Sequence, residues 1–207
     1  MPVKPGGKMM HRYRSPLTAL LLLAAAAAGA QDSPNNLRHE VDARSGNLAR
    51  SQAPLQLEPL RLAIDQRLLL AQAVARAKWN ARAVIEDLPR EALVIHAAVE
   101  QGAALGLPGD WIDAVFRAQI EASKTVQREL FAQWRAQQVD RFDDAPDLAR
   151  TVRPELDRLT AQILRSMRDN QTALRDPAGK ADVARALGVL EARTLSPAAV
   201  EQALAPF

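Results

Sequence analysis

Apolar residues recur at steps of three and four along most of the sequence after residue 54, beginning with Leu57, Leu60, Ile64 and Leu68. These steps place apolar side chains on one face of an α-helix, whereas a half-buried strand would alternate apolar and polar residues. No alternation of useful length competes with the helical pattern. The sequence therefore predicts an all-α fold, a single-domain helical bundle of about four long and two short helices.

Capping and helix-breaking residues set the expected helix ends. Asp87 is a good N-cap and Pro89 fits a first helical turn, while Asp110 should cap the next helix after a break rich in Gly and Pro. Pro154 is tolerable only near the start of the fourth long helix. The expected long helices cover about residues 54–82, 88–104, 111–134 and 154–174, an acidic loop covers 141–147, and the short helices cover 183–192 and 197–204.

The first 30 residues have the three-part layout of a secretory signal peptide. Four basic residues and no acid accompany an apolar run from Leu17 to Ala28, and Ala28-Gly29-Ala30 offers small residues for cleavage before Gln31. The run is shorter than the roughly 20 residues that span a bilayer, which favours cleavage after Ala30 over an uncleaved N-terminal anchor. We therefore expect a signal peptide at 1–30, a flexible leader at 31–53 and a helical domain at 54–207, in a periplasmic or secreted protein without stable membrane association.

The net charge changes sign once the signal segment is set aside. The chain carries 27 Lys and Arg against 24 Asp and Glu, but without the four bases of residues 1–30 the balance is 23 against 24. The mature domain therefore gives no reason to expect nucleic-acid binding, which needs a basic face. Because the chain has no cysteine, no disulfide framework can hold the exported protein together, and its core must do so.

Several polar residues stand at helical spacings within the segments rich in Ala and Leu. Arg67 and Lys78 are eleven residues apart, close to three helical turns, and Ser123 and Gln127 are one turn apart. Such spacing puts the members of each pair on one helix face, where they could line a pocket. The full set is Arg67, Lys78, Asp87, Arg90, Glu91, Ser123, Gln127 and Arg153. Taken singly, each charge would be read as part of a solvated helix face, so an exported helical binding or adaptor module is the alternative.

The residue patterns of most familiar catalytic sites are missing from the sequence. The three histidines, His11, His39 and His96, have no metal-ligand spacing. Neither a glycine-rich phosphate loop after a strand nor a nucleophile elbow is present. The three tryptophans are interpreted as core and helix-contact residues rather than as a stacking site. We therefore expect no metal and no cofactor.

Three segments together closely resemble the all-helical, AroQ-type chorismate mutases: Ala75–Trp79, Ile85–Glu91 and Phe116–Gln127. The signal peptide and the long C-terminal half resemble the exported gamma subclass of that family. The resemblance is strong over about residues 57–138 and weak elsewhere. It implies a chorismate mutase II-like fold and the Claisen rearrangement of chorismate to prephenate, a step of the shikimate pathway toward phenylalanine and tyrosine that needs no cofactor.

The reaction that the resemblance implies requires cations and hydrogen-bond donors in fixed places. Chorismate is a dianion, so cations must hold two carboxylates in a compact geometry, and donors must face the ether oxygen, where negative charge develops. By resemblance, Arg67 and Arg153 bind the carboxylates, Lys78 bridges a carboxylate and the ether oxygen, and Gln127 reaches the same oxygen. Arg150 is the alternative to Arg153, because a variable loop precedes this position.

The remaining matched positions would surround the ring of the substrate. Asp87 and Glu91 match residues that hold the ring hydroxyl in related enzymes, and Arg90 and Ser123 complete the polar wall. The expected catalytic residues are then Lys78, Arg90 and Gln127. In small intracellular relatives the arginine that corresponds to Arg153 comes from the other subunit, whereas the longer exported chains are expected to supply it within one protomer. The sequence is therefore compatible with both a monomer and a homodimer. An inactive sensor of chorismate would keep the arginines but should lose Lys78 or Gln127, and both are present.

Overall fold

The computed structural model describes residues 56–207, so the predicted signal peptide and leader lie outside the described residues. Every regular element in this range is a helix, which confirms the all-α prediction. The elements are α2 (Glu58–Asn80), α3 (Leu88–Ala103), α4 (Gly109–Ala136), η1 (Leu148–Val152), α5 (Arg153–Asp169), α6 (Gln171–Leu174), η2 (Pro177–Gly179), α7 (Lys180–Leu187), η3 (Glu191–Thr194) and α8 (Pro197–Leu204).

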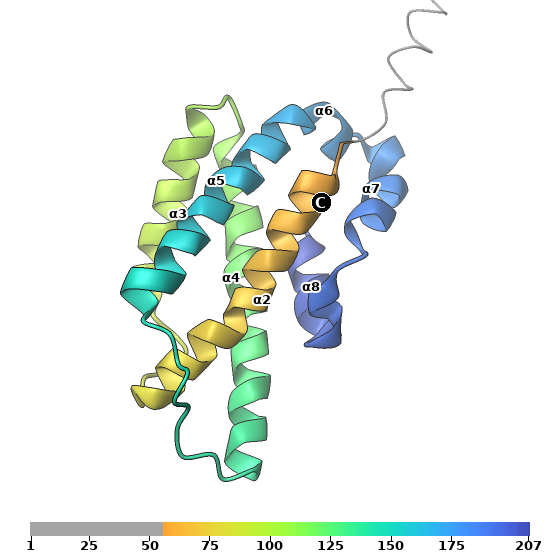
Figure 1. Cartoon of the computed structure of the whole chain (residues 1–207). Helices are drawn as coiled ribbons and strands as arrows, with labels where there is room; N and C mark the ends of the chain where they lie inside the picture. Colours follow the sequence, from red (N-terminus) through yellow and green to blue (C-terminus); the bar gives the residue numbers. More distant parts are fainter. Residues whose placement is uncertain (1–55) are drawn as a thin grey trace, which may run out of the picture. The chain divides into compact units, whose positions relative to one another are not determined.

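Helices α2 and α4 form the centre of the bundle, and the other helices pack on either side of them (Figure 1). On one side α3 packs against α4 and α5, while α5 also packs along α2. On the other side α8 packs against α4, and α7 and η3 pack against α2. The apolar stripe read from the sequence forms the core, with Leu60, Ile64 and Phe116 fully buried at the crossing of the central helices and Ile163 facing them from α5.

Some helix ends agree with the sequence prediction and others differ. Asp87 caps α3 as predicted, since its side chain accepts a hydrogen bond from the Arg90 N–H. The prediction that Asp110 caps α4 is wrong: the N-cap is Pro108, in an extended conformation, and Asp110 lies in the first turn. There its negative charge still complements the positive helix N-terminus.

The C-terminal helices are shorter than the apolar pattern suggested. Helix α5 ends at Asp169, and Leu174 belongs to the separate short helix α6. The predicted helix 183–192 is divided, because α7 ends at Leu187 before Gly188 and the chain resumes as η3. In both places apolar residues at helical spacing continue across a break, so periodicity alone could not find the boundary.

Helix α2 ends in a tight turn that reverses the chain, so that the next residues run beside the last turn of the helix. The Ala83 N–H donates to the Lys78 carbonyl and the Arg82 N–H to the Trp79 carbonyl, the paired bonds of a Schellman motif. Arg82 adopts a positive φ of 52° to make this turn. The segment after α2 is thereby brought beside the Lys78 side chain.

Aromatic side chains form a second, smaller core at the same end of α2. Trp79 packs edge-on against Trp134, and Trp134 against Phe142 in the loop after α4, with ring centroids 5.5 and 4.6 Å apart. Asn80 exchanges two hydrogen bonds with the Phe142 backbone, of 2.7 and 2.9 Å. Trp79 and Trp134 are therefore core and helix-contact residues, as predicted, and they anchor the loop that leads to η1 and α5.

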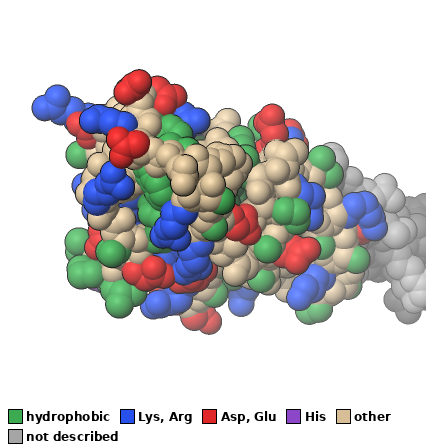
Figure 2. Space-filling model, turned by 90° about the horizontal axis from the view of Figure 1, so that it is seen from below, with side chains coloured by type: hydrophobic (Ala, Val, Ile, Leu, Met, Phe, Trp, Pro, Cys, Tyr) green, Lys and Arg blue, Asp and Glu red, His purple; other side chains and the backbone are tan. Residues whose placement is uncertain are grey.

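The surface of the described bundle mixes charges of both signs. In the view of Figure 2, Lys and Arg side chains are interspersed with Asp and Glu rather than gathered into one patch. Within residues 56–207 no helix combines the length and the apolar character that a membrane span requires.

Candidate active site

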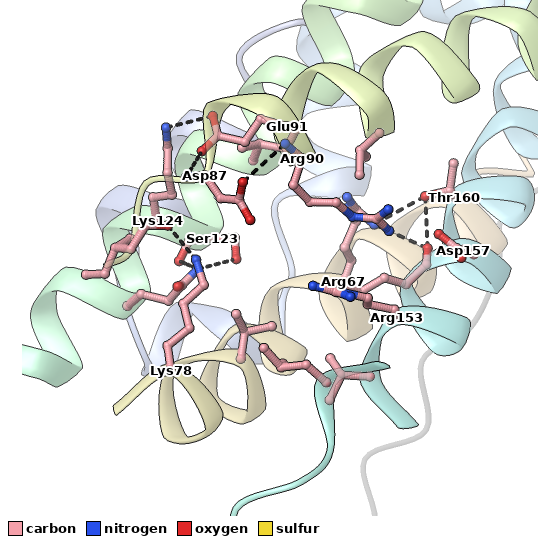
Figure 3. Close-up of a pocket in the computed structure, with 18 residues that line it drawn as sticks. Arg67, Lys78, Asp87, Arg90, Glu91, Ser123, Lys124, Arg153, Asp157 and Thr160 are labelled. Carbon is pink, nitrogen blue, oxygen red and sulfur yellow. Dashed lines mark hydrogen bonds and ion pairs between the residues drawn. The ribbon is translucent and has the colours of Figure 1, made fainter. Parts of the chain in front are cut away.

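A pocket opens between α2, the N-terminal half of α3, α4 and the η1–α5 junction (Figure 3). It encloses about 880 Å³ of space free of protein atoms, part of it open to solvent. All eight residues of the predicted polar set line it. The complete lining is Arg67, Val74, Lys78, Ile85, Asp87, Arg90, Glu91, Val94, Ile120, Ser123, Lys124, Gln127, Leu148, Val152, Arg153, Leu156, Asp157 and Thr160.

Arg67 is a buried cation of the pocket, with 7% of its surface exposed. One nitrogen of its guanidinium, Nη1, donates to the Leu156 carbonyl and to Thr160 Oγ1, both at 3.2 Å, and the group lies 5.6 Å from the centre of the Phe116 ring. Burial lowers the pKa of Arg67 to about 10, against the opposing attraction of Asp157. The group thus stays charged near neutral pH, and most of its five N–H donors are left for a ligand.

Lys78 lies on the same face of α2, eleven residues further along. Its ammonium group donates to the Ile85 carbonyl, which the turn after α2 brings back toward it. Half-burial lowers the pKa of Lys78, while the nearby carboxylates of Asp87 and Glu91 oppose that shift. An ammonium group with one fixed acceptor has two further N–H donors to offer to the pocket.

The start of α3 is fixed by a reciprocal cap. Asp87 Oδ1 accepts the Arg90 N–H, and the Asp87 N–H donates to Glu91 Oε1, both at 3.2 Å. This exchange resembles a capping box, except that the acidic partner, Glu91, lies four residues after the N-cap and not three. It holds Asp87, Arg90 and Glu91 at the rim of the pocket in one rigid turn.

Ser123 and Gln127 face each other along α4. Gln127 is 3% exposed, and its Nε2 donates to the Ser123 carbonyl at 3.2 Å and to Ser123 Oγ at 3.1 Å. Its Oε1 is buried without a hydrogen-bond partner. A half-turn of the amide would let Ser123 Oγ donate to Oε1 and would free Nε2 to donate to a ligand, with loss of the bond from Nε2 to the Ser123 carbonyl.

The arginine that the sequence left ambiguous has one clear position in the structure. Arg153 lines the pocket at the start of α5, and Figure 3 shows its side chain approaching those of Arg67 and Arg90. Arg150 does not line the pocket: its side chain is 88% exposed and lies 3.8 Å from Asp147. The structure therefore groups Arg153, and not Arg150, with the other predicted residues.

Sequence reasoning missed three polar residues of the lining. Asp157 and Thr160 are four and seven residues after Arg153 and so share its face of α5. That spacing was a usable signal. Lys124 follows Ser123 directly and gave no such signal, because its burial depends on acidic residues of other segments.

The pocket as a whole is suited to a small dianion. Five cationic side chains against three anionic ones give it a formal net charge of +2. Among residues 56–207, the side chains of Arg90 and Arg153 make no ion pair or hydrogen bond, so their charge is not neutralised locally. Val74, Val94 and Ile120 supply apolar wall between the charged groups. No group of acids and histidines in the described range could hold a metal ion. The arrangement can bind two carboxylates and present donors between them.

Residues 60–128 match the family model described as chorismate mutase type II. The chain is 32% identical to a secreted chorismate mutase of Mycolicibacterium smegmatis over 142 residues, or 68% of this chain and 78% of that one. It is 30% identical to the secreted chorismate mutase of Yersinia pestis over 144 residues, or 70% and 76%.

Solved structures agree with the sequence comparisons. A chorismate mutase from Burkholderia thailandensis superposes with a TM-score of 0.63 at 34% identity, covering 72% of this chain and 96% of that one. The secreted enzyme of Yersinia pestis superposes with a TM-score of 0.60 at 28% identity, covering 73% and 96%. The predicted fold is thus confirmed beyond its helical content, and the chain belongs to the type II chorismate mutase family.

Proposed function

We propose that this chain is a chorismate mutase, an isomerase of the intramolecular transferase class that converts chorismate to prephenate in the route to phenylalanine and tyrosine. The observation that carries the proposal is the convergence of Arg67, Arg90 and Arg153 with Lys78 and Gln127 on one pocket of net positive charge. An adaptor that used the same charges for docking would spread them over an outer surface.

The three arginines are assigned to binding the two substrate carboxylates. They come from α2, α3 and α5, so they can contact a compact substrate from different sides (Figure 3). The rearrangement breaks one carbon–oxygen bond and forms one carbon–carbon bond within the same molecule, with no covalent enzyme intermediate. Holding the reacting ends together in advance removes much of the entropic part of the barrier.

Lys78 and Gln127 are assigned to the ether oxygen, where negative charge develops as the bond breaks. The free N–H groups of Lys78 suit this role, and a half-turn of the Gln127 amide would present its Nε2 to the pocket while Ser123 Oγ donates to Oε1. Donors fixed in advance in a buried site stabilise the transition state more than mobile water does.

Asp87 and Glu91 are assigned to the ring hydroxyl, with Ser123 and Arg90 completing the polar wall. Both carboxylates lie at the pocket rim in the capped first turn of α3. A carboxylate has about four acceptor sites, so one that is already bonded to the backbone can accept a hydroxyl as well.

A coupled measurement of chorismate loss and prephenate formation on purified residues 31–207 tests the proposed activity. Turnover that is lost in Lys78→Ala and retained in Arg150→Ala supports it. Binding of chorismate without conversion would identify a sensor. If neither binding nor conversion occurs with a folded protein, the chain is a helical module of another kind.

We further propose export with cleavage after Ala30, giving a periplasmic or secreted enzyme that starts at Gln31. The layout of residues 1–30 and the two relatives named as secreted support this proposal. N-terminal sequencing of the exported form should begin at Gln31. Recovery of the intact chain in the membrane fraction would contradict cleavage.

Arg67 and Arg153 of one chain line the same pocket, which supports a site that is complete within one protomer. If the site is complete in this way, activity does not depend on a homodimer. Activity per chain should stay constant as the enzyme is diluted below the concentration at which any dimer dissociates, as measured by light scattering alongside turnover.

A further inference from the structure

Lys124 is a buried lysine on α4 to which the proposed reaction gives no role. Its side chain is 7% exposed, and its ammonium group meets carboxylates from three segments. These are Glu91 of α3 at 3.1 Å, Glu86 of the α2–α3 connection at 3.9 Å, and Glu121 one turn earlier on α4. Of the three carboxylates, only that of Glu91 lines the pocket. Lys124 thus lines the pocket beside Glu91, and its ammonium group is engaged by carboxylates.

The Glu91 carboxylate is held from both ends. Its Oε1 accepts the Asp87 N–H at 3.2 Å, and its Oε2 accepts from the Lys124 ammonium. Each oxygen keeps a second acceptor site, so the group can still receive a donor from the pocket. Both contacts are made by groups that are themselves fixed, one by the helix cap and the other by burial.

We propose that Lys124 is a positioning residue, which keeps the Glu91 carboxylate turned so that its free acceptor sites receive the ring hydroxyl of the bound substrate. This inference rests on the proposed chorismate mutase activity. It assigns to Lys124 a function at the site that is exerted through neighbouring residues, chiefly Glu91.

The surrounding charges show why Glu91 depends on this lysine. Glu86 and Glu121 carry like charge on its outer side, and Asp87 lies beside it at the start of α3. The other nearby cations are engaged elsewhere: Lys78 on α2 donates to the Ile85 carbonyl, and Arg128 on α4 pairs with Glu86 at 2.7 Å. Arg67 on α2, Arg90 on α3, and Arg153 and Asp157 on α5 complete the charged groups of the pocket. Without Lys124, Glu91 Oε2 would have no donor among the described residues, and the carboxylate could turn away from the pocket.

The same lysine also acts on Lys78 through space. Its positive charge contributes to lowering the pKa of Lys78, behind the larger effect of burial. Removing the charge of Lys124 should therefore raise the pKa of Lys78. The active form of the site has a protonated Lys78, so the basic limit of activity should move to higher pH.

The test compares three variants by pH profiles of kcat/KM and by thermal unfolding. Lys124→Met removes the charge at similar length, and Lys124→Arg keeps it. Arg128→Met is the matched control, because Arg128 lies one turn further on α4 and pairs with the same connection through Glu86, but does not line the pocket. If Lys124 only held the α2–α3 connection against α4, Lys124→Met would change the same quantities as Arg128→Met.

We expect Lys124→Met to lower kcat/KM by about tenfold, since one hydrogen bond to a charged group is at stake, and to move the basic limit of activity to higher pH. Lys124→Arg should restore most of the loss, and Arg128→Met should keep the wild-type kcat/KM and pH profile. In a Glu91→Gln background, Lys124→Met should no longer lower kcat/KM, because the carboxylate that Lys124 holds is already absent. The inference is overturned if Lys124→Met leaves kcat/KM unchanged in a folded protein, or if it lowers kcat/KM as much in the Glu91→Gln background as in the wild type. A wild-type protein without turnover would instead refute the proposed activity.

Discussion

The packing of α7, η3 and α8 on the central helices differs from the pocket in how buried charge is treated. Asp65 of α2 is 5% exposed, and its two carboxylate oxygens accept the N–H groups of Glu191 and Ala192 at 3.0 and 2.8 Å. At the pocket, Arg67 is as deeply buried, yet only one of its nitrogens donates, and Arg153 has no partner among the described residues. Charge that serves the fold is matched within the chain, whereas charge at the pocket is left for a ligand.

Two glutamines on α4 refine this comparison. Gln119 donates to the Ala203 carbonyl of α8 at 3.0 Å, and its Oε1 is buried and unpaired, as is that of Gln127. An unpaired amide oxygen therefore does not by itself mark a site. What distinguishes Gln127 is its place in the lining of a cationic pocket, where a turn of the amide changes what a ligand meets.

The largest effect is expected from Lys78→Ala. The ammonium group is a fixed donor at the proposed reacting centre, and losing such a donor costs about 3 to 4 kcal/mol of transition-state stabilisation, or roughly 10²–10³-fold in kcat. Circular dichroism should show unchanged helical content, because the lysine's hydrogen bond serves only the Ile85 carbonyl. Near-normal turnover in the folded variant would show that the Lys78 charge does not act on a ligand, and the contrast between the pocket and the rest of the fold would not hold.

Arg153→Ala should lower kcat/KM by roughly a hundredfold, because a charge-assisted bond to a substrate carboxylate would be lost. Arg150→Ala is the matched control: the residue is one helical turn earlier and its side chain is 88% exposed. It should keep wild-type kcat/KM. Steady-state kinetics of the two variants provide the measurement. A large loss in Arg150→Ala with normal kcat/KM in Arg153→Ala would show that Arg150 is the arginine that binds the carboxylate.

On the other side of the bundle, Asp65→Ala should reduce stability and leave catalysis intact. One buried and one partly buried backbone N–H group would lose their acceptor, which should lower the free energy of unfolding by about 2 kcal/mol. Asp65→Asn keeps one acceptor oxygen and should lose less. Urea denaturation gives the stability, and kcat/KM per folded molecule should stay within about twofold. A large loss of turnover at full folding would show that the two regions are coupled.

The features that the sequence predicted correctly depend on neighbours in the chain. The Asp87 cap, the position of Pro154 in the first turn of α5 and the apolar stripes follow from residues within a few positions of one another. The grouping of the eight polar residues came from the family resemblance, since spacing alone links only pairs on one helix. Periodicity failed at Leu174, because apolar residues continue across the break after Asp169.

The features that sequence reasoning missed depend on contacts between distant segments. Lys124 appears in the sequence as a helix charge like any other, and it is buried only because Glu86 and Glu91 come to it from another part of the chain. Thr160 accepts a hydrogen bond from Arg67, which is 93 residues away in the sequence. Asp110 was a reasonable cap, but the extended Pro108 begins α4 two residues earlier, and this choice depends on how the α3–α4 connection packs.

The smallest and most specific effect concerns the amide of Gln127. Gln127→Glu should lower activity at neutral pH by about tenfold, because an ionised carboxylate offers no donor and repels the charge developing on the ether oxygen. Burial should raise the pKa of the introduced carboxyl, and its protonated form is again a donor, so activity should recover as the pH is lowered. The wild type has a side chain that does not titrate and should show no such recovery. Paired pH–rate profiles provide the measurement, with Gln119→Glu as the control, because Gln119 lies on the same helix but is bonded to α8 and does not line the pocket. Identical profiles for the wild type and Gln127→Glu would mean that this amide does not face the ether oxygen, and Gln127 would then join Gln119 among the residues that serve the fold.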